Sequence, residues 1–579
     1  MSSPRPNRPA RVATLVLLVA AAGVACCPPA AAAPLDEAGS PPANASEVDR
    51  EPRIAELYPN PTTEENRGEY LVVFLPERGN WSLSDGHHDA RIPANASGAV
   101  ALSTAPNRTA SIREDSRRDA EPTGPGATGT SPAEIRRLTD HFPLSAAGDR
   151  IELRRNGSAV DTVAYDRARE GYRWRAAWDE WRPRGYEPRS PKRTADARVT
   201  PFVLPDSPGV PVEPLRTADD RLLLAGYTLT SARVADALVA AADRGVRVRV
   251  LLEGSPVGGF PARSARLLDR LMNAGVAVRV LDGEVERFRF HHPKYAVADD
   301  DAVVLTENWK RSGTGGRGSR GWGALVEGGV NVKSGVGTES GAGTEPDATV
   351  ADDLAALFRE DFRAHDARPW REFRADTEFH GGGRANGSYP TRFDAPAEPA
   401  AADVTVLTAP GNAADRIVAR IDAADERVLA VAPRAAGPDD RIVRALRRAA
   451  DRGVDVHLLL SDAWYDREAN RNLSEALGDE PIAVDLAAPR GRYDTVHAKG
   501  LVVDDTAIVG SLNWNPSAAT SNREVVLAVE NESLADFYAR AYAADWRGGS
   551  VHLPVGLLAG FGVALAAAGA VARREVAFG

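Results

Sequence analysis

The sequence predicts an α/β protein of two duplicated lobes with mixed sheets, preceded by a small all-β sandwich domain and followed by a transmembrane helix. Three observations lead to this fold class. A helix–strand unit occurs twice, many short strands with turn signals come before it, and a long uncharged segment lies near the C-terminus. The chain has 579 residues, too many for one domain, and its composition of 43% hydrophobic and 26% charged residues is that of a globular protein. The net charge of −10 argues against nucleic-acid binding over the whole surface, although a local basic groove stays possible.

The N-terminus has the features of a secretory signal peptide, which we expect to span residues 1–33. Three arginines precede an apolar run at 12–25, and small residues follow up to Ala33. Cleavage there would remove Cys26 and Cys27, the only cysteines, so the mature chain would have no disulfide and no thiolate metal site. Residues 34–50 are rich in Pro, Ala, Glu and Ser and are predicted to be a flexible lead-in.

Residues 51–185 are predicted to form the β-sandwich. Short strand patterns such as 54–58 and 69–75 alternate with turn signals. The order of ELYPNP, GEYLVV, WSLSDG and GDRIELRRNGSAVDTVAYD resembles that of the lamin-tail domain. The protein partner of such a domain stays unknown, and residues 186–211 are interpreted as a linker.

The helix–strand unit appears first as AAADRGVRVRVLLE and again as RAADRGVDVHLLLS, about 200 residues later. In each copy an apolar helical pattern ends at a glycine, Gly245 or Gly453, and a β-branched run follows. Two copies at this distance indicate a duplicated pair of lobes. We place the lobes at residues 212–370 and 401–548, with a linker at 371–400.

Each lobe also carries the same polar motif. Only five of the 71 basic residues are lysines, and two of these follow a histidine by two positions. An aspartate lies five residues past each lysine and an asparagine fourteen past it. The candidate residues are His292, Lys294, Asp299 and Asn308 in the first lobe, and His497, Lys499, Asp504 and Asn513 in the second.

These residue types suit a phosphate site. If His-X-Lys lies on a strand, both side chains are on one face. A lysine ammonium and an asparagine amide can bind phosphoryl oxygens. With two such half-sites face to face, one histidine could attack phosphorus while the other protonates the leaving alkoxide. The lysines and asparagines would stabilise the charge that builds up in the transition state.

The duplicated HxKx4D motif with its downstream Asn resembles the signature of the phospholipase D superfamily, over about residues 212–548. The resemblance implies hydrolysis or transfer of a phosphodiester through a phosphohistidine intermediate, with no cofactor and no metal. It also implies supporting roles for Ser511 and Glu524 in the second copy. The first copy has Gly321 where Glu524 aligns, so we expect the second histidine to have an orienting carboxylate and the first to lack one.

Which histidine is the nucleophile therefore stays open, although the family resemblance favours His292 as nucleophile and His497 as acid. Asp299 and Asp504 are expected to end strands and hold turns, in a supporting role.

Residues 553–572 contain no charge and are rich in Ala, Gly, Leu and Val. Twenty helical residues span about 30 Å, the thickness of a bilayer core, so this segment predicts a transmembrane helix. Arg573 and Arg574 follow at once and place the C-terminus in the cytoplasm. The predicted localisation is a single-pass protein of the cell membrane with its bulk extracellular.

The sequence thus predicts a membrane-anchored extracellular phosphodiesterase, with phospholipid slightly favoured as substrate because the lobes lie so close to the membrane segment. One alternative is an extracellular endonuclease acting on DNA or RNA. Another is a non-catalytic surface protein whose duplicated pocket binds phosphate. Whether the reaction is hydrolysis or transfer stays open.

Overall fold

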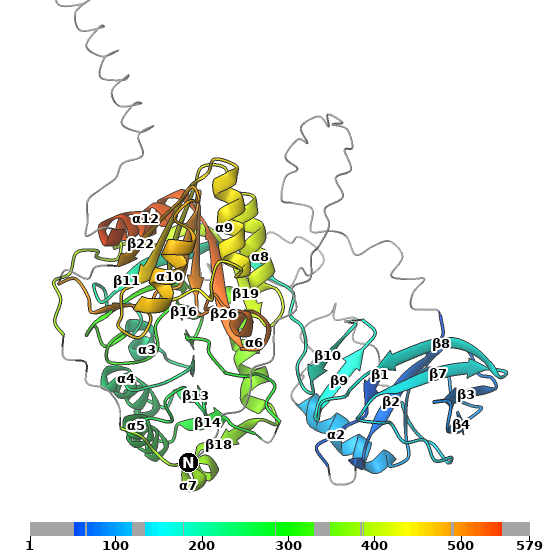
Figure 1. The fold of residues 1–579 in the computed structure, drawn as a ribbon. Helices are drawn as coiled ribbons and strands as arrows, with labels where there is room; N and C mark the ends of the chain where they lie inside the picture. Colours follow the sequence, from blue (N-terminus) through cyan, green and yellow to red (C-terminus); the bar gives the residue numbers. More distant parts are fainter. Residues whose placement is uncertain are drawn as a thin grey trace, which may run out of the picture. The chain divides into compact units, whose positions relative to one another are not determined.

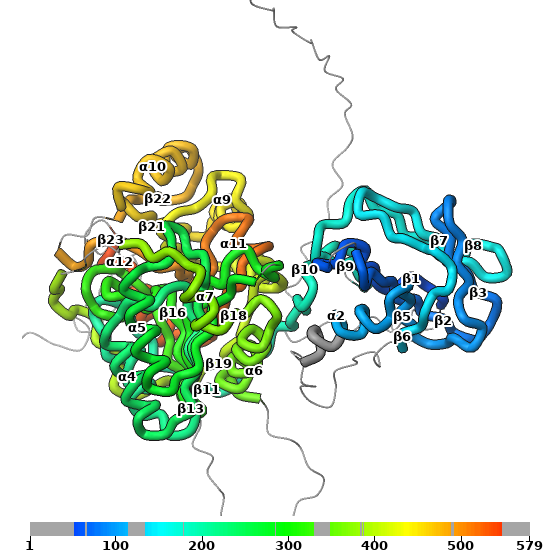
Figure 2. The backbone as a smooth tube through the Cα atoms, turned by 90° about the horizontal axis from the view of Figure 1, so that it is seen from below, coloured from blue at the N-terminus to red at the C-terminus, as the bar shows by residue number. Residues whose placement is uncertain are grey.

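The computed structural model describes residues 51–546, apart from 64–65, 119–133, 178, 284, 329–347, 382–384, 386 and 488–490. The predicted signal peptide (1–33), lead-in (34–50) and transmembrane helix (553–572) lie outside the described residues and stay predictions. Within the described part, no helix is long and apolar enough to cross a bilayer. Figures 1 and 2 show a β-rich N-terminal region followed by an α/β region.

The N-terminal region consists of two sheets around one apolar core. Leu57 and Leu71 of the six-stranded sheet and Leu83 and Leu153 of the four-stranded sheet belong to the same buried cluster. This is the arrangement of a sandwich, because the inner faces of both sheets supply the core. Helix α2 (Pro106–Arg118) lies between β5 and β6 in chain order. The six-stranded sheet has the order β10 (Glu180–Pro183), β9 (Tyr172–Arg175), β1 (Arg53–Tyr58), β2 (Tyr70–Leu75), β5 (Gly98–Ser103) and β6 (Glu134–Arg137), and the other has the order β4 (Asp89–Arg91), β3 (Trp81–Ser84), β7 (Asp149–Arg155) and β8 (Ser158–Tyr165).

The predicted linker at 186–211 is wrong for half of its length, because strand β11 (Lys192–Leu204) occupies its middle. Its first part pairs with β19 (Ala400–Ala409), and its last part pairs with β17 (Ser319–Glu327). Charged residues and prolines made this segment look like a linker. Pro201 is tolerated because only β17 is its neighbour there, so its missing N–H removes no second ladder bond.

The α/β region is a sheet of sixteen strands in which the two lobes repeat one order. In each lobe three parallel strands are followed by antiparallel ones, which agrees with the predicted mixed sheets. Strands β11 and β19 pair at the centre and join the lobes. Lobe 1 runs β18 (Ala367–Pro369), β14 (Ala277–Leu281), β13 (Arg247–Glu253), β12 (Arg221–Gly226), β15 (Tyr295–Ala298), β16 (Asp301–Leu305), β17, β11, and lobe 2 runs β19, β26 (Glu524–Glu530), β25 (Thr506–Gly510), β24 (Gly500–Val503), β20 (Arg427–Ala432), β21 (Asp455–Ser461), β22 (Ile482–Ala487), with the short β23 (Thr495–Val496) beside β17.

Helices cover both faces of each lobe. Buried residues of α4 and α5 pack on one face of lobe 1 and those of α6 on the other, while α8, α9 and α12 do the same in lobe 2. Gly245 and Gly453 follow α4 and α9, and both adopt a φ of +94°, the left-handed conformation that glycine provides at the end of a helix. The helices are α3 (Glu213–Thr217), α4 (Ala232–Asp243), α5 (Ala262–Asn273), α6 (Val350–Arg363), α7 (Trp370–Asp376), α8 (Ala413–Asp422), α9 (Arg441–Asp451), α10 (Arg467–Ala476), α11 (Pro516–Thr520) and α12 (Glu532–Asp545).

The strand directions determine where the repeated His-X-Lys motif lies. β15 is antiparallel to β12 and starts beside the residue Ala225 near the end of β12. β24 likewise starts beside the end of β20. The residues before β15 and β24 therefore lie at the carboxyl ends of the parallel strands, the edge at which open α/β sheets bind ligands.

Candidate active site

Both His-X-Lys segments lie at this edge, just before a strand. His292 and Lys294 precede β15, and His497 and Lys499 precede β24. The prediction that the motif lies within a strand is therefore off by a few residues. The segments are nevertheless tied to the sheet by backbone hydrogen bonds that reach the other lobe.

Each histidine is held by the opposite lobe. The His292 N–H donates to the Arg523 carbonyl at 2.9 Å, and the His497 N–H donates to the Arg320 carbonyl at 2.9 Å. Arg320 is the second residue of β17, and Arg523 directly precedes the equivalent strand β26. The two half-sites are therefore interlocked, and neither histidine has its backbone position fixed by its own lobe alone.

The side chain of His292 is held by Glu524. Its Nδ1 lies 3.0 and 2.9 Å from the two Glu524 carboxylate oxygens. The same carboxylate accepts hydrogen bonds from the Ser511 hydroxyl at 2.5 Å and the Asn522 amide at 3.0 Å. Burial lowers the pKa of His292 to about 4, so its ring is neutral at pH 7 with the proton on Nδ1. Nε2 then carries a free lone pair.

This contact corrects the pairing that we inferred from sequence. We expected Glu524 to orient the histidine of its own lobe, His497, but it orients His292 across the lobe boundary. The inference failed because alignment of the repeats shows which positions correspond and does not show which side chains meet.

His497 has a carboxylate of its own, from a position that the repeat does not predict. Its Nδ1 lies 3.2 Å from the Thr306 carbonyl oxygen and 3.6 Å from a Glu307 carboxylate oxygen. Glu307 is 2% exposed. It fills the space that a side chain at Gly321 would need, since a Cβ atom there would lie 2.1 Å from the Glu307 Cγ.

The first lobe thus supplies its carboxylate from Glu307, and the second supplies its carboxylate from Glu524. In the repeat, Glu307 aligns with Leu512 and Glu524 aligns with Gly321. In lobe 1 Gly321 leaves room for Glu307, and in lobe 2 the position of Glu307 is taken by the buried Leu512. The expectation that one histidine lacks a carboxylate neighbour is wrong for this reason.

The two lysines are buried beside their histidines. The Lys294 ammonium donates to the His292 carbonyl at 2.5 Å, and that of Lys499 donates to the His497 carbonyl at 2.7 Å. Burial lowers the pKa of Lys294 well below its ordinary value, and burial lowers that of Lys499 to about 8. The charge of each lysine also acts on the other.

The two histidines lie in one electrostatic environment. Burial, followed by the charges of Lys499 and Lys294, holds the pKa of His497 well below its ordinary value, and His292 also contributes. His497 has a side chain that is 30% exposed, against 9% for His292. His497 is thus the histidine that is more open to solvent.

The two asparagines complete the half-sites at the ends of the following strands. Asn308 comes after β16 and Asn513 after β25. Asn308 is buried, and its side-chain oxygen has no hydrogen-bond partner among the described residues. Because buried polar atoms are normally paired, this oxygen is suited to a bound ligand.

Three residues near the site were missed by the sequence reasoning. Tyr227 packs its ring edge-on to His292 at 4.8 Å and lies 5.6 Å from the Lys294 ammonium. Glu307 lies beside His497, as described above. Lys310 acts electrostatically on Lys294 and His497, and burial lowers its pKa. The rarity of lysine could have drawn attention to Lys310, whereas Tyr227 left no signal in the repeat.

The two motif aspartates lie away from the histidines. Asp299 and Asp504 adopt φ values of 52° and 51° in turns. Asp299 accepts backbone hydrogen bonds from 219–221, and Asp504 accepts them from 425–427. Both carboxylates thus stabilise the turns that lead into β12 and β20.

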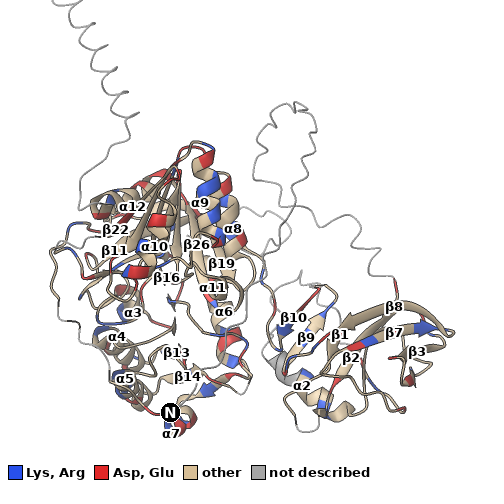
Figure 3. Ribbon diagram, viewed as in Figure 1, with Lys and Arg blue, Asp and Glu red and all other residues tan. Residues whose placement is uncertain are grey.

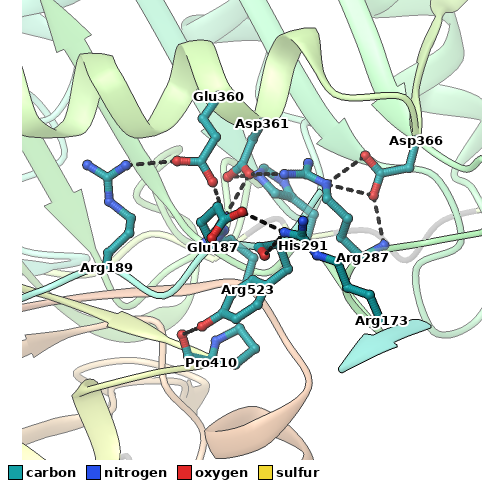
Figure 4. Close-up of polar contacts among 11 residues, drawn as sticks. Arg173, Glu187, Arg189, Arg287, His291, Glu360, Asp361, Asp366, Pro410 and Arg523 are labelled. Carbon is teal, nitrogen blue, oxygen red and sulfur yellow. Dashed lines mark hydrogen bonds and ion pairs between the residues drawn. The ribbon is translucent and has the colours of Figure 1, made fainter. Parts of the chain in front are cut away.

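Buried ion pairs hold the two arginines, Arg523 and Arg320, whose carbonyls accept the histidine N–H groups. Arg523 pairs with Asp361 of α6 at 3.0 Å, and Arg287 pairs with the same aspartate at 3.0 Å, as Figure 4 shows. On the other side Arg320 pairs with Asp545 of α12 at 2.7 Å. The last turns of α6 and α12 therefore fix the two arginines whose carbonyls hold the His-X-Lys segments.

The family model described as cardiolipin synthase, PLD-like domain, matches residues 212–320 and 417–546, which includes both half-sites. The two lobes form a domain of the phospholipase D superfamily. The superfamily resemblance is thereby confirmed for this phospholipase D-like domain, while the lamin-tail assignment of residues 51–185 stays a prediction.

Relatives and solved structures of this phospholipase D-like domain are distant. Cardiolipin synthase A of Pseudomonas aeruginosa is 35% identical over 119 residues, which are 20% of this chain and 24% of the relative. The chain thus matches about a quarter of the length of the curated relatives. Phosphatidylserine synthase of Haemophilus influenzae Rd KW20 has 14% identity and a TM-score of 0.42, covering 61% of this chain and 86% of that chain. Nuc of Salmonella typhimurium, a phospholipase D family member, has 16% identity and a TM-score of 0.21, covering 33% and 100%.

Proposed function

We propose that the protein is a membrane-anchored extracellular phosphodiesterase that hydrolyses or transfers the phosphodiester of a phospholipid. One observation carries the chemistry: two imidazoles, each held by the opposite lobe, share a site with two buried lysines. A single phosphate group between the half-sites would contact both lysines and both rings.

His292 is the proposed nucleophile. Glu524 holds the proton on Nδ1, so the lone pair of Nε2 attacks phosphorus. The N–P bond forms as the bond from phosphorus to the leaving alkoxide breaks. Water or an acceptor alcohol then attacks the phosphohistidine, and the N–P bond breaks to release His292.

His497 is the proposed general acid. It gives its proton to the leaving alkoxide in the first step and takes a proton from the attacking water or alcohol in the second. In the empty site, burial and the lysine charges keep this ring neutral. A bound phosphodiester offsets the lysine charges and so raises the pKa of His497, and Glu307 stabilises the imidazolium.

The remaining polar groups bind the non-bridging oxygens. The lysine charges of Lys294 and Lys499 stabilise the transition state, and the amides of Asn308 and Asn513 donate hydrogen bonds to it. The buried, unpaired Asn308 oxygen can accept a hydrogen bond from a hydroxyl of the substrate or acceptor.

Two observations support a phospholipid substrate. The names of the matching family model and of the Pseudomonas relative both refer to synthesis of cardiolipin, which is a phospholipid. The uncharged segment at 553–572 would hold the domain beside a bilayer, with the bulk of the chain outside the cell.

An endonuclease is the second candidate, and the charge distribution argues against it. A nucleic-acid groove needs arginines and lysines that are free to bind phosphates. Figure 3 shows basic residues along α9. Two of its arginines are paired with acids of α8, Arg441 with Asp415 and Arg448 with Asp422 at 2.7 Å. A non-catalytic phosphate-binding protein would not need two imidazoles with their Nδ1 atoms held in place.

The test is turnover by single histidine variants of the full-length protein on phosphatidylcholine vesicles and on single-stranded DNA. His292→Ala and His497→Ala should each lower turnover by at least about 10³-fold with an unchanged melting temperature. His457→Ala, on β21 and paired with Asp455, is the matched control. Full activity in either active-site variant would refute the two-histidine mechanism, and DNA cleavage that is lost with His292 would replace the lipid assignment.

A further inference from the structure

Large apolar side chains are exposed in few places of the described structure. Only four are exposed: Val160 at 42%, Val257 at 81%, Trp464 at 83% and Tyr465 at 56%. Val160 lies on β8 of the N-terminal region. The other three lie on the loops that follow β13 and β21, one loop in each lobe.

These two loops are equivalent in the repeat. Val257 and Tyr465 lie at the same distance along the chain from Gly245 and Gly453, which end the equivalent helices α4 and α9. Because β13 and β21 are parallel strands that end at the ligand-binding edge, both loops lie at the edge that holds the histidines. The same position is thus apolar and exposed on both sides of the pseudo-twofold axis.

Contacts connect each loop to the active site. The Val257 N–H donates to the Tyr227 hydroxyl at 2.6 Å, and the Tyr227 ring packs against His292. On the other side, burial and then the charges of Asp466 and of Glu307, the carboxylate beside His497, raise the pKa of the Tyr465 hydroxyl. Trp464 stands next to Tyr465 with ring centroids 5.5 Å apart.

We propose that Val257, Trp464 and Tyr465 form an apolar rim that inserts into the surface of a phospholipid bilayer and holds the active site against that surface. This inference rests on the proposed phosphodiesterase function and deepens it by assigning how the lipid is reached. Trp and Tyr are the side chains that favour the membrane–water interface, because they combine an apolar ring with a polar tip.

The chemistry of the loops favours a bilayer over a nucleic acid. The loop 254–261 contains no charged residue, and the loop 462–466 contains two aspartates and no basic residue. A track for single-stranded nucleic acid combines aromatic stacking with a positive groove, which these loops do not provide. Val257 also offers no ring on which a base could stack.

The position of the chain end agrees with a bilayer partner. Helix α12 ends at Asp545, which pairs with Arg320, and the Arg320 carbonyl holds the His497 N–H. Six residues separate Trp546 from the uncharged segment that starts at Leu553, and a chain of that length reaches at most about 25 Å. A membrane segment at 553–572 would therefore keep the rim close to the bilayer surface.

Two measurements on the full-length protein test this proposal. The first is the ratio of turnover on phosphatidylcholine vesicles to turnover on water-soluble p-nitrophenylphosphocholine. Trp464→Ala combined with Val257→Ser should lower this ratio at least tenfold, and Val160→Ala should leave it within twofold. An unchanged ratio in the double variant would refute the proposal that the rim inserts into the bilayer.

The second measurement does not depend on activity. The chain has ten tryptophans, and brominated phosphatidylcholine quenches those that enter the bilayer. The quenched fraction should fall in Trp464→Phe, and quenching that stays the same would overturn the proposal. If the wild-type protein turned over neither substrate, the proposed function would be wrong. The quenching measurement would still show whether the apolar rim enters the bilayer. Protection of Trp464 by single-stranded DNA and not by vesicles would assign the rim to nucleic acid and refute the bilayer partner.

Discussion

At the scale of single residues, the two half-sites reach the same electrostatic arrangement with different side chains. Glu524 and Glu307 come from positions that do not correspond in the repeat, yet each lies next to the Nδ1 atom of a histidine. The backbone around Gly321 still matches that around Glu524. The Thr306 hydroxyl accepts the Trp322 N–H at 2.9 Å, as the Ser511 hydroxyl accepts the Val525 N–H at 3.0 Å.

This match leads to a prediction about moving the carboxylate. Glu307→Leu should lower turnover roughly 100-fold, because His497 loses the charge that stabilises its imidazolium. Adding Gly321→Glu to that variant gives lobe 1 the same residues as lobe 2 at these two positions. The kcat of the double variant on a soluble phosphodiester should be at least tenfold higher than that of Glu307→Leu. Gly321→Glu alone should melt at a lower temperature, because its side chain meets Glu307. If the double variant were no better than Glu307→Leu, the spatial equivalence of the two acids would be wrong.

The pH dependence should show the lowered pKa of Lys499. Burial lowers this pKa to about 8, and only the protonated lysine stabilises the phosphate. Activity should therefore be present below pH 8 and fall as the pH rises through that value. The profile of kcat/KM, which reports the free enzyme, should show this alkaline limb near 8. Lys192→Ala, which removes an exposed lysine paired with Asp353, should keep the same limb, whereas a limb near 10 would contradict the assignment.

At the scale of elements, the last turns of α6 and α12 act on the site through buried arginines. Asp361 and Asp545 lie near the ends of equivalent helices, and each pairs with an arginine at the start of β26 or β17, Arg523 or Arg320. Because the carbonyls of those arginines hold the histidine backbones, helix packing and the position of His292, the proposed nucleophile, are coupled.

Asp361→Ala tests this coupling. The substitution leaves Arg287 and Arg523, both fully buried, with less opposing charge, and should destabilise the domain by about 3–5 kcal/mol. Turnover should fall as well, because Arg523 holds His292. Glu360→Ala is the matched control: it removes a partly exposed partner of the same arginine and should cost about 1 kcal/mol or less. Chemical denaturation measures the free energy of unfolding of both variants. Equal losses of stability would contradict the inference that the buried Asp361 contributes more than the partly exposed Glu360.

At the scale of the whole molecule, the pseudo-twofold arrangement makes the site a property of the pair of lobes. His292 depends on Glu524 and on the Arg523 carbonyl of lobe 2, and His497 depends on Thr306 and Glu307 of lobe 1. Strand β11, which we had interpreted as linker, pairs with β19 at the centre of the sheet and sets this arrangement. A lobe taken alone would keep its histidine and lysine and lose the groups that orient them.

The sequence by itself determined the mixed α/β class of the two lobes, their duplication and the paired His, Lys and Asn residues, because these follow from periodicity and from the spacing of repeated motifs. The tertiary structure alone decided which carboxylate meets which histidine, that Glu307 takes the place left by Gly321, and that 192–204 is a central strand. The contacts of each carboxylate with its histidine and the pairing of β11 with β19 join segments about 200 residues apart, and local sequence patterns carry no record of which distant side chains come to share one space.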